Sequence, residues 1–152
     1  MPAYHERLWP SVWLFIATAL VIPASILVLA PISLIAGVIT AVVLYAGCVV
    51  GLLLAAPIVE VEDGTLHAAK ASIATSLVGE VTSFSGDEAF KERGQRLDAR
   101  AWLMLRPWVD PIVKVPVLDA SDPAPYWIVS TRHPKELAAA INSSRRPVSG
   151  EN

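Results

Sequence analysis

A long apolar run dominates the first part of the chain. Residues 8–59 contain no Asp, Glu, Lys, Arg or His. One helix of that length would measure about 78 Å at about 1.5 Å per residue, whereas a bilayer core of about 30 Å needs only about 20 residues. The run divides near Ala30 and Pro31, and neither half shows a polar face. The pattern therefore predicts two membrane-spanning helices, at about residues 10–29 and 32–54.

Two other interpretations of the run are weaker. A buried hairpin of a soluble protein would carry a polar face on each helix, which this run lacks. A cleaved signal peptide would need a cleavage site, and Ala17-Thr18-Ala19 has the small residues for one. The apolar run continues past this tripeptide, so we expect the segment to stay in the membrane.

The charges that flank the run predict its orientation. Arg7 precedes the first helix, Lys70 follows the second, and the turn between the helices is uncharged. Positive residues favour the cytoplasmic side. We therefore expect a two-pass protein of the cell (inner) membrane with both termini in the cytoplasm, and with residues 1–9 as a cytoplasmic N-terminus.

Small residues in the second helix predict close helix packing. A partner helix can approach a strip of such residues in lipid. The chain's own first helix, a second copy of the chain and another membrane protein are all possible occupants of the strip. No ionisable residue lies within the hairpin, which disfavours a transporter or channel built from this chain alone. The strip consists of Gly47, Gly51 and Ala55, with a second small pair at Gly37 and Ala41.

A proline interrupts the first predicted helix. Pro23 lacks a backbone N–H and is expected to kink the helix. Thr18 or Ser25 could satisfy the backbone groups that the kink frees.

From Ile58 onward, apolar and polar residues alternate in short stretches that turn residues separate, as in β-strands. Asp63-Gly64 predicts a two-residue hairpin turn, and Gly79 predicts a bulge or bend. Residues 86–93 have acids first and bases last, followed by glycine, which predicts a short helix. Residues 99–109 read as a strand that includes Arg106, and Pro116 suggests that the following strand lies at a sheet edge.

The end of this region predicts one more strand and a closing helix. Tyr126–Ser130 alternates as a strand, and Pro134 is suited to the first turn of a helix over residues 134–142. The expected fold is an α+β membrane protein. It has a helical hairpin at residues 10–56 and a β-rich cytoplasmic domain at residues 57–142, a partly open barrel closed by the C-terminal helix. The polar residues 143–152 are expected to form a disordered tail.

The sequence contains no recognisable catalytic, cofactor or metal motif. Phosphate-binding glycine loops, HExxH, CxxC and GxSxG are all absent. A zinc site would need clustered His and Cys. The net charge of −2 disfavours nucleic acid as a partner. The possible metal ligands are scattered along the chain, at His5, His67, His133 and Cys48.

Basic and aromatic residues of the β-rich region form the candidate ligand or partner surface. Arginines beside tryptophans suit an anionic lipid or a phosphorylated ligand, although Trp can equally serve as core bulk. In the stretch from Pro125 to Ile141, most residues fit a strand-to-helix junction, and only Arg132 and His133 lack a structural reason. The candidate residues are Arg100, Trp102, Arg106, Trp108, Trp127, Arg132 and His133.

Three stretches, together with the hairpin before them, resemble a known family. They are SLVGEV at residues 76–81, LDARAWLMLRPWV at 97–109 and DPAPYWIVSTRHPKELAAAI at 122–141. They resemble the actinobacterial domain of unknown function 3093 family. That resemblance implies a small two-pass inner-membrane protein and no specific chemistry. The order of elements is also similar to that of bacterial membrane-anchored pleckstrin-homology-like domains, in architecture only.

The sequence leaves three functional hypotheses. The first is a non-enzymatic binding or scaffolding protein that docks to a membrane partner or to a second copy of itself. The second is a membrane-surface domain that senses anionic lipid. The third is a membrane-bound enzyme whose site would draw on Arg100, Arg106, His67 and His133. We expect no cofactor, no metal and no nucleic acid.

Overall fold

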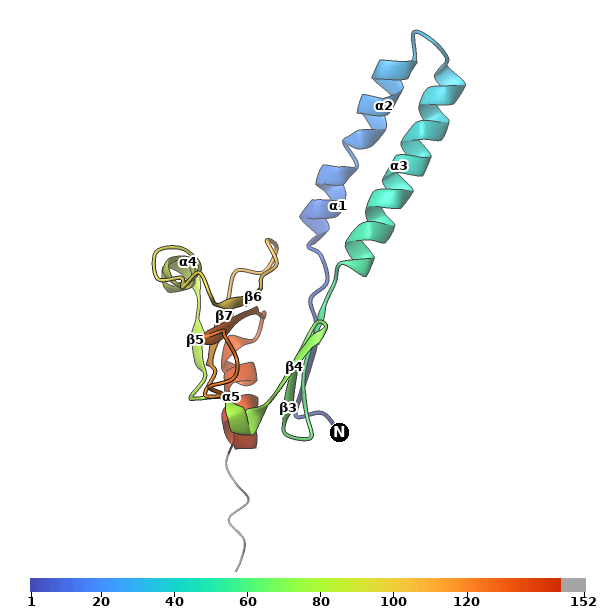
Figure 1. Cartoon of the computed structure of the whole chain (residues 1–152). Coiled ribbons are helices and arrows are strands. Elements are labelled where there is room, and N and C mark those ends of the chain that lie inside the picture. Colours follow the sequence, from blue (N-terminus) through green and yellow to red (C-terminus); the bar gives the residue numbers. More distant parts are fainter. Residues whose placement is uncertain (146–152) are drawn as a thin grey trace, which may run out of the picture. The chain divides into compact units, whose positions relative to one another are not determined.

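The computed structural model describes residues 1–145 of the 152-residue chain, and within them the chain forms two compact units (Figure 1). The helical unit comprises Trp9–Ala56. The β-rich unit combines Met1–Leu8 with the chain from Pro57 onward. Residues 1–8 of the expected cytoplasmic N-terminus are therefore part of the β-rich unit, and the helical unit is an insertion within that unit.

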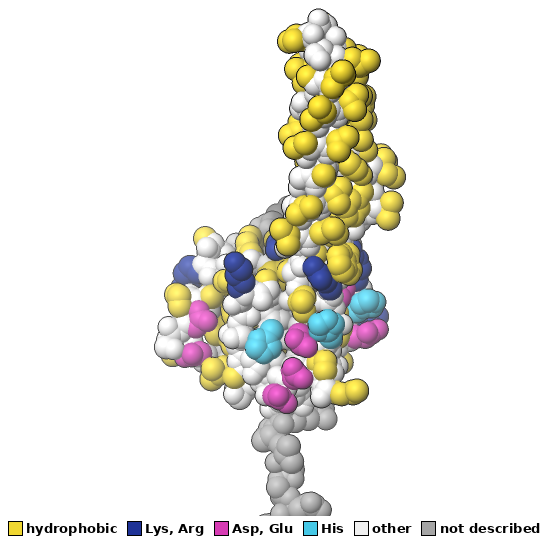
Figure 2. Space-filling model, turned by 90° about the vertical axis from the view of Figure 1, so that its right-hand side faces the viewer, with side chains coloured by type: hydrophobic (Ala, Val, Ile, Leu, Met, Phe, Trp, Pro, Cys, Tyr) yellow, Lys and Arg dark blue, Asp and Glu magenta, His cyan; other side chains and the backbone are white. Residues whose placement is uncertain are grey.

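The helical unit is a hairpin whose first arm is broken in two. The arm consists of α1 (Val12–Thr18) and α2 (Val21–Leu29), and the second arm is α3 (Leu34–Leu54). Residues Val12–Leu29 and Leu34–Leu54 are long and apolar enough to cross a membrane, with mean hydropathies of 2.5 and 2.4. Hydrophobic side chains cover much of the visible face of the hairpin (Figure 2).

The break in the first arm follows from Pro23. In a continuous helix the Ala19 carbonyl would accept a hydrogen bond from residue 23, which here has no N–H. The Ile22 N–H bonds to that carbonyl instead, at 3.0 Å. The kink is as expected, but the two predicted hydroxyls bond elsewhere: Thr18 to Leu14 and Phe15, and Ser25 to Val21.

The two arms meet at Gly37. A Cβ atom built on Gly37 would lie 3.3 Å from the Ile26 Cα, so any side chain here would crowd the backbone of the first arm. Ala41, one turn further along, is also buried. Outside their own stretch of α3, no atom of the described residues lies within 4 Å of a Cβ built on Gly47 or Gly51, and both glycines are exposed. The first arm therefore packs on the second small pair of α3, and the Gly47-Gly51 face is open.

The first sheet of the β-rich unit brings the two ends of the chain's apolar run together. Its order is β1-β2-β3-β4, with every neighbouring pair antiparallel. Arg7 pairs with Ile58, and the Leu8 N–H donates to the Pro57 carbonyl at 2.9 Å. The strands are β1 (Tyr4–Arg7), β2 (Ile58–Glu62), β3 (Thr65–Ala68) and β4 (Ala71–Ala74).

The predicted turn at Asp63-Gly64 is confirmed. Glu62 pairs with Thr65 across it, and both turn residues have positive φ, 48° and 69°. Such a turn matches the twist of two adjacent strands, which is why it favours Asp or Asn followed by Gly.

The chain passes from the first sheet to the second around Gly79. A short 3-10 helix, η1 (Thr75–Leu77), ends β4, and the Gly79 N–H then donates to the Pro116 carbonyl. A Cβ on Gly79 would lie 3.1 Å from the Pro116 side chain, so glycine allows this close crossing. The second sheet has the order β5-β7-β8-β6 and comprises β5 (Thr82–Phe84), β6 (Trp102–Met104), β7 (Ile112–Pro116) and β8 (Tyr126–Ser130).

Two strand predictions are wrong in detail. The strand expected over residues 99–109 is only three residues long, because a turn closed by Ala101 precedes it and Pro107 follows it. Arg106 lies outside the strand. The strand that holds Pro116 lies inside the sheet rather than at its edge, and proline is tolerated there because it is the last residue of β7.

Both faces of the second sheet are covered, which explains why all five residues of β8 are buried. Trp127 and Val129 enter a core shared with the first sheet and α5 (Pro134–Arg145). Tyr126 and Ile128 face a smaller cluster with α4 (Gly86–Arg93), the predicted short helix. The α+β class is confirmed: apolar helices, then strands in two sheets, then a C-terminal helix.

The closing helix is longer than expected. It runs from Pro134 to Arg145, so residues 143–145 of the predicted tail are helical. The hydroxyls of Ser143 and Ser144 bond back to the carbonyls of Ala139 and Ala140. The rest of the predicted tail, residues 146–152, lies outside the described residues.

Candidate functional site

A surface hollow of about 420 Å³ lies between the two sheets of the β-rich unit. One side is the tight turn between β3 and β4, where Ala69 has a φ of 55° and Lys70 follows it. The other side is β6 and the residues after it, as far as Arg106. The hollow therefore exists only because the two sheets pack on a shared core.

The walls of the hollow combine two cations with apolar surface. Lys70 and Leu103 are exposed, the latter at 42%. Trp102 is half-buried and stacks on Trp127 with ring centroids 4.3 Å apart. Arg106 is held through its backbone N–H, which donates to the Ser130 hydroxyl at 3.0 Å, and its guanidinium donates to the Leu105 carbonyl.

Among the described residues that line this hollow, none is acidic and two are basic, Lys70 and Arg106, although the whole chain carries −2. On the face of the β-rich unit shown in Figure 2, most Lys and Arg side chains gather along one edge, and most acidic and His side chains lie away from it. A site of this kind can attract an anion and contact an apolar group at the same time.

The structure brings only some of the predicted surface residues together. Trp102, Arg106 and Trp127 belong to the hollow or support its wall. Trp108 donates its indole N–H to the Leu8 carbonyl at 3.2 Å, where the chain leaves β1. Arg100 pairs with Asp98 at 3.1 Å in a local turn and does not line the hollow.

Arg132 and His133 lie at a second, smaller hollow of about 310 Å³, beside the start of α5. Their position has a structural cause. The Arg132 backbone N–H donates to the Glu6 carboxylate at 3.1 Å. The His133 N–H donates to the Thr131 hydroxyl, and the His133 carbonyl accepts the first hydrogen bond of the helix, from Leu137.

Glu6 is the centre of a buried polar cluster that joins the first strand to the last strand and its helix. Its carboxylate is 8% exposed and accepts hydrogen bonds from the Tyr4 and Thr131 hydroxyls, at 2.5 and 2.6 Å. The His133 ring lies 3.6 Å from the same carboxylate. Sequence reasoning missed Glu6 because its main partner is 125 residues away.

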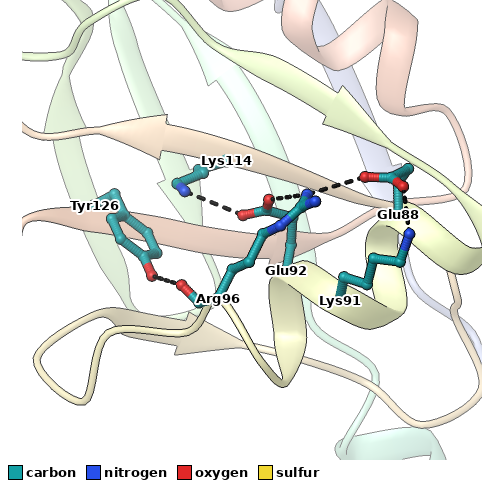
Figure 3. A network of polar contacts seen from close by, with 6 residues as sticks. All are labelled: Glu88, Lys91, Glu92, Arg96, Lys114 and Tyr126. Atoms are coloured by element: carbon teal, nitrogen blue, oxygen red, sulfur yellow. Dashed lines mark hydrogen bonds and ion pairs between the residues drawn. The ribbon is translucent and has the colours of Figure 1, made fainter.

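A second buried carboxylate, Glu92, fastens α4 to the second sheet (Figure 3). It accepts from Lys114 and Arg96, each at 3.1 Å, and Arg96 also reaches the exposed Glu88. Burial alone would raise the pKa of Glu92, but the hydrogen bonds from Lys114 and Arg96 outweigh it and hold that pKa below its usual value. The Lys114 ammonium also lies 4.3 Å from the centroid of the Tyr126 ring.

The candidate ionisable groups do not form a metal site in the described part of the chain. No group of three His, Cys, Asp or Glu side chains within residues 1–145 could hold a metal ion. The His5 ring lies 3.2 Å from the Glu60 carboxylate on the neighbouring strand β2. His67 lies opposite Glu60 in the register of the next strand, β3. These three residues form a row across the exposed face of the first sheet.

Comparison with known proteins gives one match. The sequence model of a family described as protein of unknown function (DUF3093) matches residues 3–141. No curated protein and no solved structure matches the chain. The likeness to pleckstrin-homology-like domains therefore stays a prediction.

Proposed function

We propose, from the premise that this chain belongs to the DUF3093 family of proteins of unknown function, that it is a membrane-anchored, non-enzymatic binding or scaffolding protein. The helical unit is the anchor, and it crosses the membrane twice. The β-rich unit is the part that meets a ligand or partner.

The observation that carries this proposal is the insertion of the apolar hairpin between two paired strands. Arg7 and Ile58 face each other in one sheet, and the whole helical unit lies between them in the sequence. If both arms cross a bilayer, β1 and β2 can pair only when they emerge on the same side. An anchor with an even number of crossings meets that condition, and a single crossing does not.

The side chains on the hairpin surface also support anchoring. Large apolar residues are widely exposed there, for example Leu27 at 75%, Ile35 at 74% and Leu54 at 80%. Monomeric soluble proteins rarely leave such a continuous apolar surface open. In lipid the same surface is solvated, and the helices satisfy their own backbone groups. The cytoplasmic side follows from Arg7 and Lys70, which flank the hairpin.

Two features favour binding over catalysis. The buried carboxylates Glu6 and Glu92 each hold several hydrogen bonds that fasten one element to another. Among the described residues, every buried side-chain N or O atom has a hydrogen-bond partner. Polar groups that are already satisfied inside a fold are typical of structural roles.

A protein partner would have an open surface on the anchor. The α3 face of Gly47, Gly51 and Ala55 is exposed, and the hairpin's own first arm packs elsewhere. We propose this face as the contact for a helix of another membrane protein or of a second copy.

Cell fractionation and cysteine labelling test the anchor together. The full chain carries Cys48→Ala and one new cysteine, at Ser144 or at Glu62. One membrane sample is washed with alkaline carbonate, and a second, sealed sample is labelled with an impermeant maleimide. We expect the protein to stay in the membrane pellet, and both cysteines to react only after the cytoplasmic face is opened. Release by carbonate, or labelling of the two sites from opposite sides, would contradict the proposal.

Co-purification tests the partner contact. Full-length protein is isolated in mild detergent, and its mass is compared with that of the Gly47→Ile and Gly51→Ile double variant. We expect a stoichiometric companion or a dimer with the natural sequence, and a monomer with the variant. An identical mass for both proteins would exclude this face as the contact.

A further inference from the structure

We propose that the hollow between Lys70 and Arg106 binds the phosphate-bearing headgroup of an anionic membrane phospholipid. This inference rests on the proposed membrane anchor and names the ligand class of the β-rich unit. Lys70 and Arg106 would face the phosphate, and Leu103 and the edge of Trp102 would contact the glycerol and the first acyl carbons.

The composition of the hollow matches an anionic amphiphile better than a soluble anion. Two cations with no lining acid provide the charge complementarity. A soluble phosphate site would be expected to offer more polar donors around the anion. Here the remaining wall is carbon: Leu103 is exposed, Trp102 is half-buried, and Ala69 and Ala71 complete it.

The backbone ties this hollow to the point where the chain enters the sheet from the anchor. The Ala69 N–H donates to the Ile58 carbonyl at 2.9 Å, so the turn that carries Lys70 lies beside the first residue of β2. The chain leaves α3 at Leu54. Four residues of extended chain span at most about 14 Å. In a membrane-inserted protein this turn is therefore tethered within reach of the headgroup layer.

Neighbouring residues have the character of a membrane-facing edge. Arg7 pairs with Ile58 on the other side, and Trp108 bonds to the carbonyl of Leu8. Aromatic and basic side chains are enriched where proteins meet lipid headgroups, and each Lys or Arg near an anionic surface contributes about 1 kcal/mol. The hollow is the place on this edge where cations and carbon surface form a concave site.

Binding of short-chain lipids to the full chain in a non-ionic detergent tests the inference. Fluorescently labelled dihexanoyl phosphatidylglycerol and phosphatidylcholine are titrated with the protein, and anisotropy gives the dissociation constants. We expect phosphatidylglycerol to bind at least about tenfold more tightly, because only it carries a net negative charge. Its affinity should fall as salt is raised.

Matched variants assign the binding to this hollow. Lys70→Glu should weaken the binding of phosphatidylglycerol about tenfold, whereas Lys70→Arg should leave the affinity close to that of the natural chain. Leu103→Asp should weaken it as well, because it places a carboxylate against the lipid. Lys135→Glu makes the same charge change at an exposed position of α5 and should alter the affinity less than about twofold. The near-UV circular dichroism of each variant checks its fold, and Lys70→Gln replaces Lys70→Glu if that spectrum changes.

Several results would overturn the inference. Equal affinity for the two lipids, or equal losses for Lys70→Glu and Lys135→Glu, would show that no specific headgroup site exists here. Displacement of the labelled lipid by glycerol phosphate at the concentration that intact lipid requires would identify a soluble phosphate ligand instead. Carbonate extraction of the natural chain separates the two proposals: a chain that stays in the membrane but binds the two lipids equally refutes the site and leaves the anchor standing.

Discussion

The hydroxyl of Tyr4 lies inside the β-rich unit, where it donates to Glu6 and also lies 2.9 Å from the Thr131 hydroxyl. Burial of the ring, followed by the hydrogen bond to the Glu6 carboxylate, raises the pKa of Tyr4 far above its usual value of about 10. The contact with Thr131 lowers the pKa by less. Deprotonation of Tyr4 would place two negative charges side by side in a buried site.

This cluster predicts a loss of stability at alkaline pH. Above about pH 10 the unfolded chain releases the Tyr4 proton and the folded chain keeps it, so the folded state binds more protons and the free energy of unfolding falls as pH rises. The slope contributed by one group is at most about 1.4 kcal/mol per pH unit. Urea unfolding of the full chain in detergent, followed by Trp fluorescence between pH 8 and 11, measures it.

The variant Tyr4→Phe isolates this contribution. It cannot ionise at position 4, so its unfolding free energy should fall less steeply with pH than that of the natural chain. Tyr45→Phe is the matched control because Tyr45 lies on α3, in the other unit. Parallel slopes for Tyr4→Phe and the natural chain would refute the assignment.

Glu92 and Glu88 allow a comparison of a buried and an exposed ion pair with the same arginine. Glu92 is 6% exposed at its side chain and Glu88 is 52% exposed, and both contact Arg96. Glu92→Gln leaves the partly buried Lys114 without its anion and should lower the unfolding free energy by about 2 to 3 kcal/mol. Glu88→Gln should cost much less, because solvent screens an exposed ion pair. Equal losses in urea unfolding would show that burial does not strengthen the Glu92 contacts.

At this scale, the sequence predicts local features and misses distant ones. Asp63-Gly64 predicts its turn because these two residue types readily adopt the positive φ angles that the turn requires. Glu6 carries no such signal, since an acid near the N-terminus looks like any solvated charge until β1 pairs with β2. Arg132 and His133 lacked an explanation for the same reason: their backbone partners, Glu6 and Thr131, are brought there by the fold.

Among the elements, α3 carries two sets of small residues that the structure uses differently. Gly37 and Ala41 contact the first arm of the hairpin, whereas no other segment of the described residues 1–145 lies within 4 Å of a Cβ built on Gly47 or Gly51. Gly37→Ile should push the arms apart by about 1 to 2 Å, because interhelical distance follows the side chains at the contact. Gly47→Ile should leave the hairpin unchanged. Pulsed electron paramagnetic resonance between spin labels at the exposed Val28 and Val42, with Cys48→Ala, measures the separation.

The control within this experiment is the pair of variants itself. Both introduce the same side chain into the same helix, so any general effect of isoleucine on the helix appears in both. If Gly47→Ile widens the hairpin as much as Gly37→Ile, the first arm packs along the whole of α3, and Gly47 is not available to a partner.

The sequence could not show which of these two pairs of small residues contacts the first arm, because both pairs have the same spacing of four residues. The contact is made by α2, whose Ile26 and Leu29 lie against Gly37. The position of Pro116 in the sheet was also not predictable from the residue type alone. Its missing N–H argued for a sheet edge, yet a proline at the last residue of an inner strand removes no hydrogen bond that the ladder needs.

For the whole molecule, the decisive feature is that the β-rich unit is discontinuous in sequence. A chain in which a four-residue Gly-Asn-Gly-Ser loop replaces Trp9–Ala56 joins Leu8 to Pro57, which are already neighbours. Hairpin loops of this length are common between antiparallel strands. We expect this protein to dissolve without detergent and to keep the near-UV circular dichroism of the natural unit.

A chain that begins at Pro57 is the contrasting case. It lacks β1, so β2 becomes an unpaired edge, and the Thr131 hydroxyl and the Arg132 N–H lose their acceptor Glu6. Its free energy of unfolding should be lower by about 3 kcal/mol or more, from these lost bonds to a charged group. A stable, well-packed protein from residue 57 onward would refute the role assigned to the first strand.

The sequence predicted the apolar hairpin, the strand-rich region and the closing helix because each follows from local periodicity. It did not predict that residues 4–7 would join the sheet, because four residues are too few to show a period that distinguishes a strand from a loop. The hollow at Lys70 was missed for a related reason: its two walls come from different sheets, and only the packing of the two sheets on a shared core brings them together.

The inserted hairpin has a consequence for how the protein is made. The ribosome completes β1 first and β2 only after about fifty further residues, and closing a free loop of that length costs about 3 kcal/mol in chain entropy. Once the two arms have folded against each other in lipid, the ends of the loop are already close, and little of that entropy remains to be lost. For the anchor proposed above, insertion into the bilayer would therefore come before the first strand finds its partner, and a chain that failed to insert would leave its N-terminus unpaired and open to cellular proteases.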